Sequence, residues 1–140
     1  MRRGRLLPML LLGACTAASP SPAVSVHDPG DLDSKAREIG GLVRAAQPCS
    51  LVLSQPARER AARIEEAALE IERHRGGTQA RDAFLRGMAP PAFEPKRRGR
   101  DRAAWCAEQG PALLRMDAML NGPEGTALVQ RAEAAQASLP

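Results

Sequence analysis

Apolar residues beyond position 30 recur at intervals of three and four, which is the spacing that places side chains on one face of a helix. The longest such stripe lies within residues 54–75 and predicts a helix that Ser54 caps. Its inner positions are Ala57, Ala61, Ile64, Ala68 and Ile71. Gly76-Gly77 follows, and we expect it to end the helix with one glycine in the left-handed conformation.

Shorter stripes predict further helices on both sides of this one. They are expected at residues 31–47, 78–88, 101–120 and 124–138. Asp31 or Asp33 is expected to cap the first of them, and Asp101 the third. Gly110-Pro111 is expected to kink or break the third helix, so that the count is five or six.

These elements are all helical, and most connections between them are short. The sequence therefore predicts an all-α fold, with a single compact domain over residues 31–140. Residues 89–100 hold three prolines and a glycine and are expected to be irregular. Residues 51–53, Leu-Val-Leu, are expected to form a buried connection, with a short strand as the alternative. Large aliphatic residues are sparse and alanine is abundant, so we expect thin, alanine-lined helix contacts.

The first fifteen residues carry a different pattern. Three arginines precede the apolar run Leu6–Leu12, and Gly13-Ala14 stands directly before Cys15. The run is too short to span a bilayer, which takes about 20 residues, and has the length of a secretory signal core. Leu12-Gly13-Ala14-Cys15 resembles the lipobox of bacterial lipoproteins. The resemblance implies that residues 1–14 are removed as a signal peptide and that Cys15 is acylated and inserted in a lipid bilayer.

The lipoprotein interpretation has consequences for the next segment. Residues 15–30 are rich in serine and proline and would form a flexible tether that reaches roughly 45 Å. Thr16, rather than aspartate, follows the cysteine, which in a bacterium with two membranes implies the outer membrane, facing the periplasm. An ordinary secretory signal, cleaved after Thr16-Ala17-Ala18, is the alternative and would give a soluble periplasmic protein.

Charge and cysteine content narrow the possibilities further. The formal net charge is +4, and removal of residues 1–14, which carry three arginines and no acidic residue, lowers it to +1. Such a near-neutral domain argues against nucleic-acid binding, which needs a sustained basic surface. Once Cys15 is acylated or removed, Cys49 and Cys106 remain, and an oxidising compartment favours a disulfide between them. Two buried, unpaired thiols are the alternative.

Residue types that carry catalysis or bind cofactors are few. His27 falls in the predicted tether, and His74 lies between two arginines near a helix end, as an ordinary surface residue does. Glu70 and His74 share a helix face, but two ligands do not hold zinc. Glu65 and Glu66 are interspersed with arginines, a pattern typical of a solvated face. We therefore expect no catalytic residue, cofactor or metal site, and a hydrolase with paired carboxylates is the less favoured alternative.

The densest charge in the chain lies before and within the start of the helix predicted at residue 101. The basic residues there are Lys96, Arg97, Arg98, Arg100 and Arg102. We expect them to lie on a loop, where the favoured interpretation is structural, with the arginines bonded to helix carbonyls and nearby glutamates. The alternative is that they contact an anion, either a lipid head group or an acidic protein. Phe93 and Trp105 flank the segment and are expected to fold it onto the core.

These features together predict a non-enzymatic lipoprotein of the bacterial envelope that acts as a binding or structural module. A periplasmic chaperone, or an inhibitor of a cell-wall enzyme, is the alternative. In size and cysteine count the chain is similar to periplasmic acid-stress chaperones, a general likeness on which no function is based.

Overall fold

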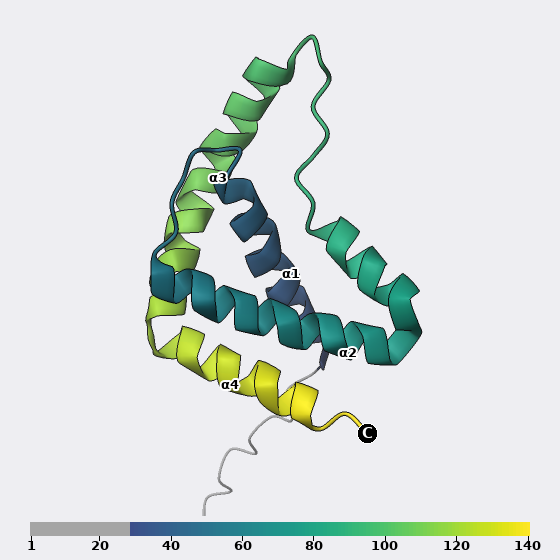
Figure 1. Ribbon diagram of the computed structural model, residues 1–140. Helices are drawn as coiled ribbons and strands as arrows, with labels where there is room; N and C mark the ends of the chain where they lie inside the picture. Colours follow the sequence, from purple (N-terminus) through teal and green to yellow (C-terminus); the bar gives the residue numbers. More distant parts are fainter. Residues whose placement is uncertain (1–28) are drawn as a thin grey trace, which may run out of the picture.

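The computed structural model describes residues 29–140, which are helical and contain no strand. Four helices follow one another in Figure 1: α1 (Pro29–Ala46), α2 (Gln55–Gly87), α3 (Arg98–Asn121) and α4 (Pro123–Ala137). The all-α prediction is therefore confirmed. The predicted signal segment, Cys15 and nearly all of the predicted tether lie outside the described residues.

Four helices are present instead of the predicted five or six, because α2 continues beyond the kink at Gly76-Gly77 and α3 continues through Pro111. Gly76 (φ −145°, ψ 22°) and Gly77 (φ 65°, ψ −157°) leave helical geometry, yet helical turns resume at once, so α2 has two limbs. The positive φ of Gly77 is the kind of conformation that glycine adopts without strain. Pro111 lies inside α3, which continues through it. Proline has no backbone N–H, so the helix lacks one hydrogen bond at this position. The Pro111 ring faces solvent, and Leu113 remains buried in the core.

Three smaller expectations also change. α1 begins at Pro29, ahead of Asp31, and α3 begins at Arg98 rather than at an Asp101 cap. Asp101 instead lies in the first turn of α3, where the positive end of the helix dipole stabilises its carboxylate. The prediction of a buried connection holds for Leu53 and is wrong for Val52, whose exposed fraction is 88%.

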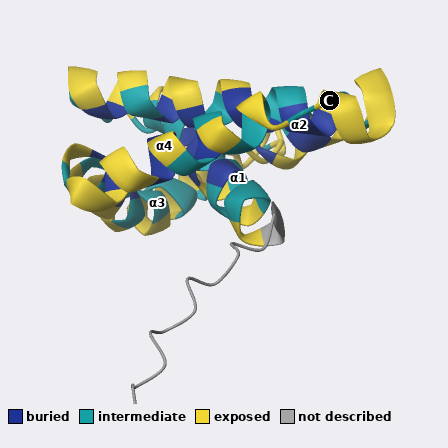
Figure 2. Ribbon diagram, turned by 90° about the horizontal axis from the view of Figure 1, so that it is seen from below, coloured by how far each residue is buried: buried dark blue, intermediate teal, exposed yellow. Residues whose placement is uncertain are grey.

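All four helices contribute side chains to the hydrophobic core. Its largest fully buried members are Phe84, Ile39, Ile64, Met88, Leu113 and Leu120. Alanines such as Ala57, Ala61 and Ala68 line the remaining contacts, as the composition predicts. Figure 2 shows these buried positions turned inward, between α2 and α4 on one side and α1 and α3 on the other. The second limb of α2 closes over α1, where the Arg37 guanidinium lies 4.7 Å from the centre of the Phe84 ring.

The connection between α1 and α2 runs alongside α3, and we call its residues 51–54 the strap. The Ser54 N–H donates to Asp117 Oδ1 at 2.7 Å, and Asn121 Nδ2 donates to Ser54 Oγ at 2.8 Å. One end of the strap is thus tied to the last turns of α3. At its other end Leu51 lies beside Gly110 of the same helix. The strap therefore lies along the outer side of α3 between Gly110 and Asn121.

Candidate functional site

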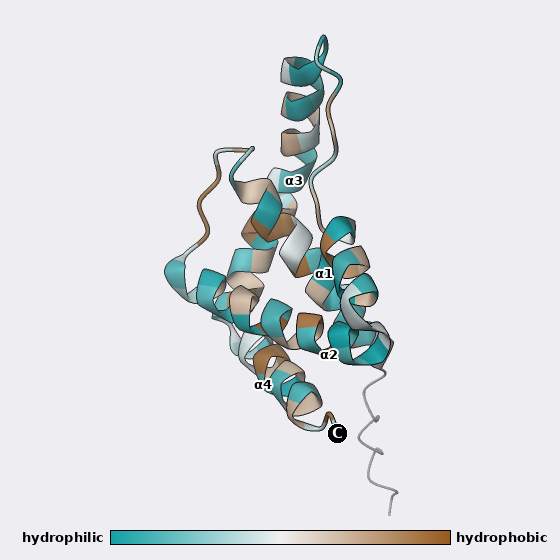
Figure 3. Ribbon diagram, turned by 45° about the vertical axis from the view of Figure 1, so that its right-hand side comes forward, coloured by the Kyte–Doolittle hydropathy of each residue, from teal (hydrophilic) through white to brown (hydrophobic). Residues whose placement is uncertain are grey.

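The loop after α2 and the first turns of α3 form an arm, residues 89–106, that projects beyond the rest of the molecule (Figures 1 and 3). Its base is fixed by Cys106, which lies at disulfide distance from Cys49, with an S–S separation of 1.96 Å and a Cα–Cα distance of 5.3 Å. The pair meets the limit of about 7 Å between Cα atoms that a disulfide requires. Cys49 belongs to the turn after α1, so the arm is joined to the end of that helix.

Two aromatic side chains hold the loop of the arm against its helix. The rings of Phe93 and Trp105 pack edge to face, with centroids 5.7 Å apart and planes at 62°. Both side chains are half-buried, and neither belongs to the main hydrophobic cluster. The expectation that they fold the basic segment onto the core is therefore wrong. They pair on the arm itself and keep the segment away from the core.

The end of the arm carries the five basic residues that the sequence singled out, which we call the basic tip. They are Lys96, Arg97, Arg98, Arg100 and Arg102, and all five are exposed. The prediction that they lie on a loop is correct for Lys96 and Arg97 only, because α3 already begins at Arg98. The three remaining arginines therefore stand on the first turns of a helix, where regular backbone fixes their spacing.

The basic tip makes few contacts with its own chain. Its ion pairs within residues 31–140 all go to Asp101, from Arg97 at 3.5 Å and from Arg100 at 4.0 Å. Over the same residues, none of its side chains donates a hydrogen bond to a helix carbonyl or to a glutamate. The favoured structural interpretation, in which the arginines bond helix carbonyls and glutamates, thus receives no support from these residues. Five cations face one neighbouring carboxylate, which leaves the tip with an excess of positive charge.

The backbone adds to this charge. Arg97 occupies the N-cap position of α3 and provides no side-chain hydrogen bond to the first turn. The first N–H groups of a helix, and the positive end of its dipole, attract anions when no cap occupies them. Carboxylate or phosphate groups at the tip would therefore meet charged side chains and backbone donors together. The arrangement suits binding through several exposed charges, and no nucleophile or general base lies among its residues.

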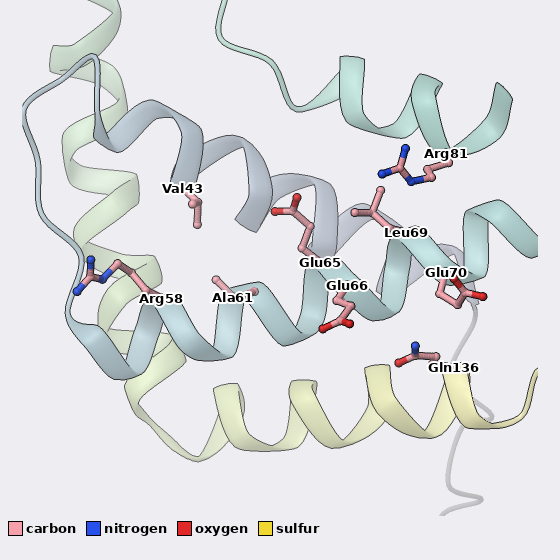
Figure 4. A pocket seen from close by; sticks show the side chains of 10 residues that line it. Val43, Arg58, Ala61, Glu65, Glu66, Leu69, Glu70, Arg81 and Gln136 are labelled. Carbon is pink, nitrogen blue, oxygen red and sulfur yellow. The ribbon is translucent and has the colours of Figure 1, made fainter. Parts of the chain in front are cut away.

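A second candidate is the cleft of about 440 Å³ in Figure 4, where Glu65, Glu66 and Glu70 lie on α2. Arg44 donates to both oxygens of Glu65, at 2.9 and 2.6 Å, and this bond raises the pKa of the Arg44 guanidinium. Arg73 donates to Glu70 and lowers the pKa of that carboxyl. A glycosidase needs a carboxyl of raised pKa as its general acid. The shift at Glu70 is in the opposite direction, which does not favour the hydrolase interpretation.

The remaining sequence candidates are placed as surface residues. His74 is exposed beside the kink of α2. Within the described residues no group of three or more histidine, cysteine, aspartate or glutamate side chains is arranged to hold a metal ion. Over the same range, none of the helices combines the length and hydropathy of a membrane span.

Comparison with known proteins gives no further guide to function. No protein family matches the chain, and no curated protein or solved structure is similar to it. Any function assigned here therefore rests on the side chains that the fold exposes.

Two large apolar side chains are exposed, which was not predicted from the sequence. Leu114 on α3 has an exposed fraction of 67%, and Val52 on the strap one of 88%. A signal for the former was present, because the apolar residues of α3 form two stripes. Leu113, Met116 and Leu120 face the core, while Ala103, Ala107, Pro111, Leu114 and Ala118 follow a second 3–4 spacing and are all exposed.

Proposed function

We propose that the protein is a non-enzymatic lipoprotein of the bacterial envelope that binds an acidic partner protein through the basic tip. The observation that carries the proposal is the basic tip itself, five exposed cations with a single carboxylate beside them. The lipobox resemblance at Cys15 supports the location, outer membrane and facing the periplasm. The tip supports the activity, because its charges make few contacts with the rest of the protein.

The position of the tip favours a protein partner over the membrane that would hold the lipid anchor. The chain enters the domain at Pro29, and α1 runs about 27 Å from there to the turn that holds Cys49. From Cys106 the arm continues about 12 Å to Arg98. The entry point and the tip therefore lie at opposite ends of the domain (Figure 1). A partner protein can therefore reach the tip without passing the tether.

The anchor is tested with the full chain and its Cys15→Ala variant in a diderm bacterium. We expect the original chain in the membrane fraction after a high-salt wash and the variant in the soluble periplasmic fraction. Acylation supplies the binding energy, at about 0.8 kcal/mol for each buried methylene group. Ser19→Ala, which alters the alternative cleavage region, is the control and should stay with the membrane. A variant that remains bound, or a mature protein that begins at Ser19, would refute the lipoprotein assignment.

The tip is tested by a matched pair of double variants, Arg98→Gln with Arg102→Gln, and Arg58→Gln with Arg86→Gln. All four arginines are exposed and have no ion pair within residues 31–140, and each variant removes two charges. We expect the tip variant to bind poly-L-glutamate about fivefold more weakly, since each exposed charge pair contributes on the order of 0.5 kcal/mol. The control variant should bind as the original protein does, and both should keep its melting temperature.

Two results would contradict the binding proposal. Equal loss of affinity in the two double variants would mean that net charge, not the tip, attracts the anion. Tighter binding to phosphatidylglycerol vesicles than to poly-L-glutamate, abolished in the tip variant, would assign the tip to a lipid surface.

A further inference from the structure

The exposed stripe of α3 leads directly to the basic tip. Its positions are Arg100, Ala103, Ala107, Pro111, Leu114 and Ala118, which follow one another at intervals of three or four residues and are all exposed. Such intervals place side chains on one helix face. One straight face of α3 therefore carries a cation at its outer end and apolar side chains over the rest of its length.

Val52 widens this face at its apolar end. The strap runs beside α3 from Gly110, which Leu51 approaches, to Asp117, which accepts the Ser54 N–H. Val52 lies in the chain between these two attachments, and the α3 turn that holds Leu114 lies between Gly110 and Asp117. The strap is coloured largely as hydrophobic in Figure 3. Val52 and Leu114 are the two large apolar side chains that the described residues expose most, and both belong to this region.

We propose that this face, from Val52 and Leu114 to Arg100, binds an amphipathic helix of a partner protein that is acidic at one end. The inference rests on the proposed function, because the acidic end is what the basic tip would hold. Large side chains of the partner would pack around Val52 and Leu114. Ala103 and Ala107, which lie on the stripe between Arg100 and Leu114, allow the two helix axes to approach closely, within the usual 8–10 Å.

The charges beside the stripe indicate where the acidic residues of the partner must lie. Beside the apolar part of the stripe, Glu108 and Arg115 carry opposite charges, so neither an acidic nor a basic side chain of the partner is favoured there. At the outer end Arg100 lies on the stripe itself and favours acid there, while Arg98 and Arg102 point from other sides of the same helix turns. Fourteen residues separate Arg100 from Leu114, which is about 21 Å along a helix. A partner helix of about four turns is therefore needed to touch both ends of the face.

The face is a poorer match for a bilayer surface. Helices that lie in a membrane interface bury large aromatic and aliphatic side chains. Here the stripe is mostly alanine, with Leu114 as its one large aliphatic residue, and it suits helix packing better than insertion between lipids.

The test uses the full-length Cys15→Ala protein and two synthetic 21-residue helical peptides. Each peptide has a leucine stripe on one face and four glutamates at one end, at the N-terminus in one and at the C-terminus in the other. We expect one of the two to bind more tightly, which gives the direction of the partner helix. Val52→Gln with Leu114→Gln should weaken that peptide about tenfold, since two apolar anchors are lost. The same variant should bind poly-L-glutamate as the original does.

Controls separate this inference from the proposed function. Ala83→Gln with Ala127→Gln adds the same polar groups at exposed sites on other helices and should leave peptide binding unchanged. Arg100→Gln, which changes the cation on the stripe, should weaken peptide binding about twofold, since an exposed charge pair contributes on the order of 0.5 kcal/mol. If the tip variant weakens binding of poly-L-glutamate while neither Arg100→Gln nor the Val52 and Leu114 variant weakens binding of the peptide, the proposed function stands and the helix inference falls. If the tip variant weakens neither probe, the proposed function falls as well.

Two further outcomes would assign the face to another occupant. Light scattering that shows a dimer, converted to monomer by the Val52 and Leu114 substitutions, would identify a second copy of this chain. Binding to anionic vesicles that is lost in the same variant would identify a membrane. Either result overturns the proposal of a partner helix.

Discussion

Reduction of the bond between Cys49 and Cys106 is expected to lower the melting temperature by about 15 °C or more. The two cysteines are separated by 57 positions, and closing a loop of that size stabilises a protein by roughly 4 kcal/mol through the entropy of the unfolded chain. For a domain of this size each kcal/mol moves the melting temperature by about 4 °C. The effect is a large part of the total, because the core contains few large aliphatic side chains.

The measurement is thermal unfolding by circular dichroism, with and without reductant. The Cys15→Ala protein is suitable, because Cys49 and Cys106 are then its only cysteines. Cys49→Ser with Cys106→Ser should melt at the temperature of the reduced protein and should not respond to reductant. An unchanged melting temperature, with both thiols shown by alkylation to be free, would contradict the structural role of the bond.

The same bond fixes the arm, so its loss should also be visible locally. Without it the base of the arm is no longer joined to the turn after α1. Backbone amides of residues 89–106 are then expected to exchange with solvent faster than those of α2 and α4.

Where local signals decide the structure, the sequence was a sufficient guide. Ser54 caps α2 and accepts a hydrogen bond from the Ala57 N–H at 3.4 Å, as its position before the apolar stripe predicts. Gly77 takes the positive φ expected at the glycine pair. The pairing of Cys49 with Cys106 followed from the cysteine count once Cys15 was assigned to the export signal. In each case a residue type with a strong preference occurs at a position where few alternatives exist.

Where tertiary contacts decide, sequence reasoning was wrong. Gly110-Pro111 was expected to kink or break a helix, and the break does not occur, because α3 passes through Pro111 with Cys106 fixed on one side and Leu113 buried on the other. Val52 was expected to be buried, and it is exposed. The expectation was wrong because three apolar residues in a row do not reveal which of them faces outward. Alternation along the strap buries Leu53 and exposes Val52.

For the candidate site, too, one part could be predicted from the sequence and another part could not. The charges of the basic tip were visible in the sequence, because five basic residues within seven positions are unusual. Their few contacts with the rest of the chain were not predictable, since that depends on which glutamates and helix ends come near. The Phe93–Trp105 contact, which lies on the arm and apart from the core, is the reason that such partners stay distant.

Substitution of Gly125 by alanine is expected to destabilise the protein by about 3 kcal/mol, the second large effect. Gly125 is buried in the first turn of α4, where the chain reverses after α3. A Cβ atom there would lie 2.5 Å from Leu120 Cα and 2.6 Å from the Leu120 carbonyl carbon, with the carbonyl oxygen closer still. These are backbone atoms of the last turn of α3, so relief requires that the two helices move apart. The Leu120 carbonyl also accepts a hydrogen bond from Arg60, which such a movement would strain.

Gly99→Ala is the matched control, because Gly99 also lies in the first turn of a helix and a methyl group added to it would meet nothing within 4 Å. Alanine is the better helix former, so this variant should be as stable as the original or more stable by less than about 1 kcal/mol. Urea unfolding of the two variants measures the difference directly, since the midpoint shifts while the slope stays constant. Equal midpoints for the two would mean that α4 does not press against the end of α3. A low midpoint for Gly125→Ala alone would establish that the close approach of Gly125 to Leu120 stabilises the fold.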